Sequence, residues 1–280
     1  MINIAKKTKI VCTIGPASDS YETLVELVRA GMNVMRLNFS HGDYAGHLSK
    51  IELARRIERE QGIFIPVMLD TRGPEIRLGL LENDGCDIPK DHVFVISMEP
   101  ILGTPERISV TYPGLYDDVK IGDHLKIDDG NLDLVIIDKN KTQRELVVRA
   151  LNGHRLKSRK GVNAPFARLS MPFISNKDRD DLAFGVEHKV DYIAASFTRR
   201  PQDVLDIRQT IAELGGSPIP IIAKIENPEG VENLEAIINV ADGIMVARGD
   251  LGVEIPAERV PIIQKQIGRA SCRERVLVTV

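Results

Sequence analysis

Four short groups of polar residues stand at the ends of apolar runs, where buried strands would finish. In the first group, Arg36, Asn38 and Ser40 alternate with Leu37 and Phe39. Because side chains alternate across a strand, the three polar residues would share one face. A guanidinium beside two neutral oxygen ligands suits a phosphate next to a monovalent cation. The alternative is a polar turn that only ends the strand.

The second group crowds a carboxylate, a hydroxyl and two guanidinium groups into a few residues. It contains Asp70, Thr71, Arg72, Glu75 and Arg77. Arginine suits bidentate contact with phosphate because its donors form a planar fork. A salt-bridged hinge would explain Arg72 or Glu75, but it explains Asp70 and Arg77 together less well.

The third and fourth groups combine a lysine with two carboxylates. Lys224 and Glu226 are two residues apart on an otherwise apolar run, so both would point to one face. A lysine buried there needs a partner, because burying an unpaired ammonium is costly. Asp250 follows the next apolar run and would lie beside Glu226, and two such carboxylates suit Mg²⁺ or Mn²⁺. For one pair alone, a structural lysine–carboxylate bridge is the alternative.

No known phosphate-binding loop accompanies these groups. The sequence contains no Walker-A loop, no Gly-x-Ser-x-Gly and no kinase Gly-rich loop. Side chains and metal ions would therefore hold any nucleotide phosphate, which predicts phosphoryl transfer by positioning and charge neutralisation. Lys160 is a further candidate for a nucleotide phosphate, although a solvated loop would also explain the basic run around it.

Strands and helices that could position these groups alternate at both ends of the chain. The apolar runs predict strands at residues 9–14, 33–39, 64–70, 192–197, 219–225 and 243–247. Helical patterns predict helices at residues 21–30, 47–60, 177–187, 201–214, 231–238 and 257–267. Between them the pattern changes to short β segments with no convincing helix, at residues 92–97, 107–111, 124–128, 134–138 and 145–151.

This alternation predicts an α/β fold with a parallel sheet covered by helices. The first strand is not followed by a Gly-rich dinucleotide turn, and the polar groups follow the carboxyl ends of strands. We therefore expect a (β/α)8 TIM-type barrel, incomplete here with about six units, and an inserted small all-β barrel domain. The predicted division is a first barrel segment at residues 1–70, a β domain acting as a lid at 71–170, a second barrel segment at 171–267 and a non-native tail at 268–280.

The composition excludes several classes of protein. Lys and Arg number 37 against 40 Asp and Glu, so the net charge is −3 and gives no electrostatic reason to expect nucleic acid as a partner. No apolar run approaches the roughly 20 residues of a membrane span, and no signal peptide is recognisable. Cys12, Cys86 and Cys272 are too scattered for a disulfide framework or a cysteine zinc site. We expect a cytoplasmic protein.

Seven stretches resemble motifs of the pyruvate kinase family, in the family's order, and their style resembles its bacterial members. They are residues 12–16 (CTIGP), 35–43 (MRLNFSHGD), 69–77, 160–163 (KGVN), 194–197, 224–227 and 245–256 (MVARGDLGVEIP). The resemblance covers about residues 5–267. It implies transfer of a phosphoryl group from phosphoenolpyruvate to ADP in glycolysis, giving pyruvate and ATP, and full-length members that are homo-oligomers, usually tetramers.

The resemblance also implies roles for individual residues. Lys224 and Arg36 would be catalytic, with Arg36 on the phosphoryl group and Lys224 on the charge of the transferring group and the enolate. The implied binding residues are Arg36, Lys224, Gly249 and Asp250 for the substrate; Asn38, Phe39, Ser40, His41, Arg77 and Lys160 for the nucleotide; Glu226 and Asp250 for Mg²⁺ (or Mn²⁺); and Asn38, Ser40, Asp70 and Thr71 for K⁺.

The sequence departs from the family pattern in two places. Family members continue with a Thr-Ala-Thr-Gln strand, an eighth βα unit and a further domain, which are absent from this chain, so we expect it to be inactive or weakly active as written. Ala164, Pro165 and Phe166 stand where the family usually has Leu-Pro-Gly, which makes lid closure less secure.

The end of the chain is also unusual. Gly268 and Arg269 break the apolar face of the last predicted helix, and the segment back-translates into what resembles a sequencing adapter. We interpret the tail as non-native; a seventh strand at residues 276–280 is the less favoured alternative.

Two other functions remain open from the sequence. A Mg²⁺-dependent pyruvate or oxaloacetate lyase would need the two carboxylates but would have no use for Arg36 and Arg77. A non-catalytic fragment would retain only ligand and metal binding.

Overall fold

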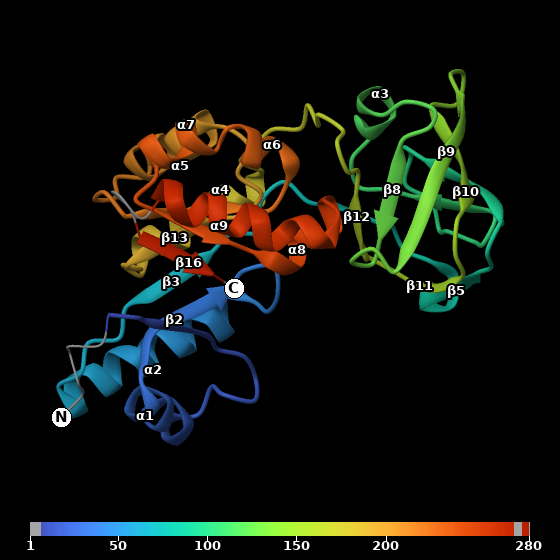
Figure 1. Ribbon diagram of the computed structural model, residues 1–280. Coiled ribbons are helices and arrows are strands. Elements are labelled where there is room, and N and C mark those ends of the chain that lie inside the picture. The colour runs from blue at the N-terminus through green and yellow to red at the C-terminus, as the bar shows by residue number, and fades with distance from the viewer. Residues whose placement is uncertain (1–6, 272–275, 280) are drawn as a thin grey trace.

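A parallel sheet of seven strands forms the larger part of the protein in a computed structural model that describes residues 7–271 and 276–279. Helices pack on one side of this sheet, and a second, separate sheet stands to one side of it (Figure 1). The strand order is β1 (Ile10–Thr13), β2 (Met32–Asn38), β3 (Val67–Asp70), β13 (Tyr192–Ala195), β14 (Ile221–Ile225), β15 (Gly243–Val246) and β16 (Val276–Thr279). This is the α/β architecture of a partial (β/α)8 barrel, as the sequence predicts.

The parallel sheet has one strand beyond the six that the sequence analysis predicts for the barrel. β16 pairs in parallel with β15, with Val276 opposite Gly243, so the structure has the seventh strand that was the less favoured alternative.

Helix α9 (Val260–Ser271) continues past Gly268 and Arg269. Its buried residues are Val260, Ile263, Ile267 and Ser271, whose spacing of three and four keeps one stripe on the core, and Gly268 and Arg269 lie beside that stripe. That residues 268–280 are non-native stays a prediction.

The helices follow the predicted order, with differences that local chemistry explains. They are α1 (Tyr21–Ala30), α2 (Tyr44–Gln61), α4 (Asn176–Glu187), α5 (Pro201–Glu213), α6 (Pro228–Glu232), α7 (Leu234–Val240), α8 (Arg248–Glu254) and α9. α2 begins three residues earlier than predicted because Asp43 caps it, accepting a hydrogen bond from the Gly46 amide at 2.8 Å. α8 is a helix where the sequence indicates only a polar strand end, and α6 and α7 replace one predicted helix.

The second sheet has the order β4 (Ile76–Arg77), β12 (Gly161–Asn163), β8 (His124–Ile127), β9 (Leu132–Asn140), β10 (Glu145–Ala150), β6 (Val93–Ser97) and β7 (Arg107–Ser109). A hairpin of β5 (Gly85–Ile88) with β11 (His154–Lys157), the one-turn helix α3 (Leu115–Asp118) and a 3-10 turn at Glu82–Asp84 complete it. The sequence does not predict four of these strands, β4, β5, β11 and β12. Segments of two to four residues are too short to show an alternation of apolar and polar side chains. Its own apolar core includes Phe94, Ile108, Leu134 and Val148.

The two faces of the parallel sheet have different neighbours. Most of its apolar side chains pack against the helices in a large core. A small cluster of Met68, Ala194, Ile222 and Met245 fills the other face. Two residues further along three of these strands, at their carboxyl ends, come Asp70, Ser196 and Lys224. The period of two therefore places polar side chains directly above an apolar layer. Among the described residues, no helix is both long and apolar enough to cross a membrane.

Candidate active site

The ammonium group of Lys224 lies at the centre of the polar layer. Its Nζ is 2.8 Å from Ser196 Oγ, 2.9 Å from Glu226 Oε1 and 3.2 Å from Asp70 Oδ1. Lys224 is only 6% exposed, and burial alone would lower its pKa. The charges of Glu226 and Asp70 outweigh burial and raise the pKa above its usual value. Lys224 therefore stays protonated at neutral pH and presents a fixed positive charge.

A second cation approaches the same carboxylate. Arg36 donates from Nε to Asp70 Oδ2 at 2.6 Å and from Nη1 to Thr13 Oγ1 at 2.7 Å. Asp70 is buried, and it also accepts a hydrogen bond from Ser196 Oγ at 3.1 Å. Two cations, Arg36 and Lys224, thus share one buried carboxylate, and this arrangement can receive a further anion.

The two predicted metal ligands differ in exposure. Glu226 is fully buried and accepts a hydrogen bond from the Phe197 amide at 2.5 Å, whereas Asp250 is exposed in the first turn of α8. Burial raises the pKa of Glu226 to about 7; Asp250 and Asp70 add to the rise, and Lys224 opposes it. A carboxylate crowded by two others is a place where a divalent cation relieves repulsion.

The donor set fits Mg²⁺ or Mn²⁺. Among the described residues no group of three or more His, Cys, Asp and Glu side chains is arranged to hold a metal ion by itself, so Glu226 and Asp250 would leave other coordination positions to water or substrate. Mg²⁺ is commonly bound by one or two carboxylates plus phosphate oxygens, so two ligands are sufficient.

The residues suggested for K⁺ also lie at the strand ends. Asn38 pairs in register with Asp70 across β2 and β3. Asn38 Oδ1 accepts from the Ser40 amide at 3.0 Å, and Thr71 Oγ1 donates to the Ala194 carbonyl at 3.3 Å. The four residues Asn38, Ser40, Asp70 and Thr71 therefore meet at one edge of the sheet, although Asp70 is already bonded to both cations.

The side chain of Phe39 lies in the core and not in the site. It is 4% exposed and stacks on the His47 ring, with centroids 4.0 Å apart. Alternation explains this, because Phe39 lies on the opposite face from Asn38 and Ser40. Only the Phe39 backbone is left to contact a ligand. Gly249 lies in the first turn of α8 and is exposed.

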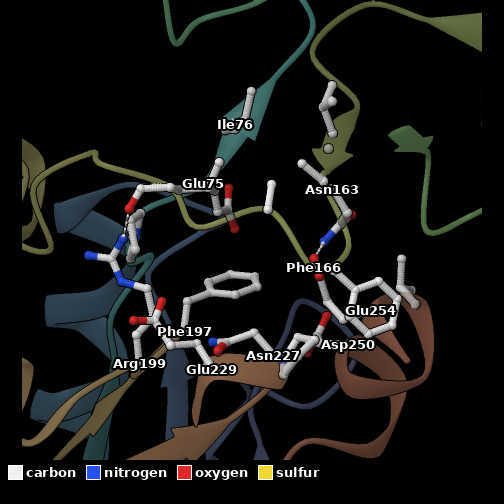
Figure 2. Close-up of a pocket in the computed structure, with 18 of the residues that line it drawn as sticks. Glu75, Ile76, Asn163, Phe166, Phe197, Arg199, Asn227, Glu229, Asp250 and Glu254 are labelled. Carbon is white, nitrogen blue, oxygen red and sulfur yellow. Dashed lines mark hydrogen bonds between the residues drawn. The ribbon is translucent and has the colours of Figure 1, made fainter. Parts of the chain in front are cut away.

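A cavity of about 370 Å³ lies between the two sheets. Figure 2 shows side chains from both parts of the chain around it, with Asn163 and Glu75 on one side and Asp250 and Glu254 on the other. The predicted nucleotide residues His41, Arg77 and Lys160 also line the cavity. Its volume lies within the range of small-molecule sites.

The two basic residues predicted to bind the nucleotide are both held by acidic neighbours. Arg77 donates from Nε to Glu75 Oε2 at 2.7 Å, and Lys160 Nζ lies 2.7 Å from Asp128 Oδ1. The Asp128 carboxylate raises the pKa of Lys160. β4 and β12 pair so that Arg77 lies opposite Gly161, the residue that follows Lys160.

Several residues of the site were missed as functional candidates in the sequence. Ser196 bonds both Lys224 and Asp70, yet it appears there only within a family motif. Asn163 Nδ2 donates to Glu254 Oε1 at 2.6 Å, and Lys126 Nζ donates to the Val253 carbonyl at 2.6 Å. These two bonds join the second sheet to α8 across the cavity. No local sequence pattern indicates these residues, because each of the two bonds joins segments that are distant in the sequence.

Glu254 gives a pH-dependent prediction. Burial raises its pKa above the usual value of 4.5, against the effects of Asn163 and Lys126. The folded state then holds its proton more tightly than the unfolded state, so the charged group reduces stability increasingly as pH rises from about 4.5 through the folded pKa. We expect Glu254→Gln to stabilise the protein more at about pH 8 than at about pH 5, measured by urea unfolding.

The matched control is Glu213→Gln. Glu213 is exposed, and hydrogen bonds from Gln209 and Arg179 lower its pKa, so its substitution should become less favourable as pH rises. Equal stability changes for Glu254→Gln at both pH values would contradict the prediction.

Comparison with known proteins decides the family. The family model described as "Pyruvate kinase, barrel domain" matches residues 5–280. The chain belongs to the pyruvate kinase family. It is 52% identical to the pyruvate kinase of Bacillus licheniformis over 262 residues and 52% identical to that of Geobacillus stearothermophilus over 260 residues. The family resemblance of the seven motifs is confirmed.

A solved structure agrees with this assignment to the pyruvate kinase family. The crystal structure of a pyruvate kinase from Cryptosporidium parvum superposes with a TM-score of 0.91 at 38% identity, covering 98% of this chain and 57% of that one. The chain spans about half the length of the curated relatives it matches: the alignments cover 94% and 93% of this chain but 45% and 44% of the two bacterial proteins.

Proposed function

We propose that the protein contributes the phosphoryl-transfer site of a cytoplasmic glycolytic pyruvate kinase, which moves the phosphoryl group of phosphoenolpyruvate to ADP and gives pyruvate and ATP. One observation carries the proposal most directly: Lys224 Nζ contacts Glu226, Asp70 and Ser196 at once, with Arg36 on the far side of Asp70. Negative charge develops on the phosphoryl group during its transfer and on the enolate that forms. A protonated lysine and an arginine beside a pair of carboxylates can stabilise that charge.

Each residue then has a defined task. Arg36 and Lys224 bind the phosphoryl group, and Lys224 stabilises the charge that moves onto the enolate oxygen. Asp70 and Ser196 orient the Lys224 ammonium, and the backbone at Gly249 with Asp250 receives the substrate carboxylate. Because Lys224 remains protonated, it acts through its charge and not as a base.

Metal ions complete the proposed site. Glu226 and Asp250 would hold Mg²⁺ or Mn²⁺, which supplies neutralisation of phosphate and enolate charge when bound. Asn38, Ser40, Asp70 and Thr71 would hold K⁺. Arg77 and Lys160, with the backbone from Asn38 to His41, would bind the phosphates of ADP in the cavity.

The second sheet supports a role as a lid over the reaction. We propose that residues 71–170 move as this lid and that residues 1–70 and 171–267 form the barrel beneath it. The Asn163–Glu254 and Lys126–Val253 bonds hold it against α8, which closes one wall of the cavity. Exclusion of water matters because water would compete with ADP for the phosphoryl group. Assembly into a homo-oligomer, usually a tetramer, is part of the same proposal.

The test measures ATP formation from ADP. The chain is joined to the remaining length of the Bacillus licheniformis relative, because it spans about half the length of that protein. We expect conversion that requires phosphoenolpyruvate, Mg²⁺ and K⁺ together. Cleavage of oxaloacetate with no phosphoenolpyruvate-dependent ATP formation would instead support the lyase.

A further inference from the structure

Phe166 is the most exposed large apolar residue among those described, and it lies at the cavity. Its exposed fraction is 69%, and it lines the cavity with Arg77 and Lys160. Figure 2 labels it among the lining side chains, with Asp250 and Glu254. The ring is therefore accessible to a ligand bound in this cavity, whose lining has both polar and apolar side chains.

The backbone at Phe166 is strained. The Ala167 amide donates to the Ala164 carbonyl at 3.1 Å, which closes a four-residue turn with Pro165 in its second position. Phe166, in the third position, has a φ of +68°, in the left-handed region. Proline in the second position and a positive φ in the third are features of a type II turn, whose third position favours glycine. A phenylalanine there costs about 1–2 kcal/mol in backbone strain.

The turn also limits the freedom of the ring. Pro165 fixes its own φ, and the hydrogen bond fixes the turn, so Phe166 leaves the backbone in one direction. Because the backbone of the turn is ordered before binding, a ligand that contacts Phe166 has only the side-chain rotamers left to fix. Strain that persists at an exposed apolar residue is therefore consistent with a binding function.

The chemistry of the cavity indicates the kind of ligand. Arg77 and Lys160 offer positive charge, which their partners Glu75 and Asp128 partly balance. Apolar surface comes from Pro74, Ile76, Ala164 and Val253. A ligand that fits both has a phosphate tail and a flat, apolar-faced ring. A nucleotide has this combination, and stacking on an aromatic side chain needs no specific base.

We propose that Phe166 is the stacking partner for the base of the nucleotide whose phosphates lie on Arg77 and Lys160. The inference rests on the proposed function, since it takes the cavity to be the ADP site. It adds a base-binding contact formed by the Ala164–Ala167 turn, at the position where this chain departs from the usual Leu-Pro-Gly of its family.

The absence of tryptophan from the sequence allows a direct test. Phe166→Trp introduces a single reporter, and we expect its fluorescence to be quenched by Mg-ADP but not by Mg-pyrophosphate, which lacks a base. The matched control is Phe64→Trp, because Phe64 is 66% exposed but does not line the cavity. Neither ligand should change its emission.

Affinity provides the second readout, measured by calorimetry on the 280-residue chain. We expect Phe166→Leu to weaken Mg-ADP binding by about 5- to 150-fold, the usual range for loss of one stacked base, with Mg-pyrophosphate unaffected. Phe166→Gly should weaken ADP binding similarly while unfolding at no lower urea concentration than the parent, because it relieves the strained φ.

The outcomes separate this inference from the proposed function. Unchanged ADP affinity in Phe166→Leu, with ADP and pyrophosphate both bound by the parent, overturns the stacking role and leaves the nucleotide site standing. A parent chain that binds neither ligand overturns the nucleotide site and the stacking role together. Equal losses for ADP and pyrophosphate also overturn the stacking role, because the residue would then act on the phosphates or on folding.

Discussion

Replacing Lys224 with Met is expected to lower the rate of ATP formation by about 10²- to 10³-fold, the range found when a charge-stabilising donor is removed from an active site. The ammonium contacts Asp70, Ser196 and Glu226, and no other lysine among the described residues lies in this cluster. The measurement is phosphoenolpyruvate-dependent ATP formation by the chain joined to the remaining length of its Bacillus licheniformis relative. Binding of Mn²⁺ should persist, since Glu226 and Asp250 are untouched.

Two further variants distinguish a loss of catalysis in Lys224→Met from a loss of folding. Lys224→Met leaves the buried Glu226 carboxylate without the cation that it contacts, which can destabilise the protein. Lys224→Arg keeps the charge but not the compact geometry, so it should fold and still lose at least about tenfold in rate. Lys141→Met, at an exposed position outside the site, should retain full activity. A folded Lys224→Met variant with more than about a tenth of the parent rate would defeat the role assigned to Lys224.

Replacing Gly73 with Ala is expected to destabilise the protein by about 2–5 kcal/mol, from left-handed strain together with overpacking. Gly73 lies between β3 and β4 with a φ of +70°, and a Cβ there would be 2.7 Å from the Ser196 carbonyl oxygen. Its amide also donates to Asp178 Oδ1 at 2.9 Å, so the backbone cannot shift without losing this buried bond. Displacing Ser196 should also lower activity, because Ser196 bonds Lys224.

The control for this prediction is Gly62→Ala. Gly62 has a nearly equal φ of +66°, but nothing lies within 4 Å of an added Cβ. We expect it to cost only about 1–2 kcal/mol, the strain of the left-handed conformation alone. Urea unfolding of both variants measures how much stability each one loses. Equal losses would contradict the prediction, because the close approach to Ser196 would then not destabilise the protein.

The corrected elements show where sequence patterns stop being informative. Helix α1 and strand β14 could be predicted because an amphipathic pattern and a mostly apolar run are local features. β4 and β12 could not, since two and three residues have no measurable period, and their pairing depends on the rest of the second sheet. α9 was cut short in prediction because Gly268 interrupts the sequence pattern, whereas the buried stripe passes beside it.

The sequence by itself determined which polar residues share a face. A strand alternates its side chains with a period of two, so Arg36 and Asn38, and likewise Lys224 and Glu226, had to project together. Cap residues and apolar runs likewise determined the order of strands and helices in the barrel.

Only the tertiary structure decided which of these faces meet. Asp70 and Lys224 are 154 residues apart, and their contact depends on β13 lying between β3 and β14. The same long-range pairing brings Ser196 between them and sets Phe166 on the wall of the cavity. Contacts between distant segments leave no local period in a chain, so only the pairing of strands across the whole fold determines them.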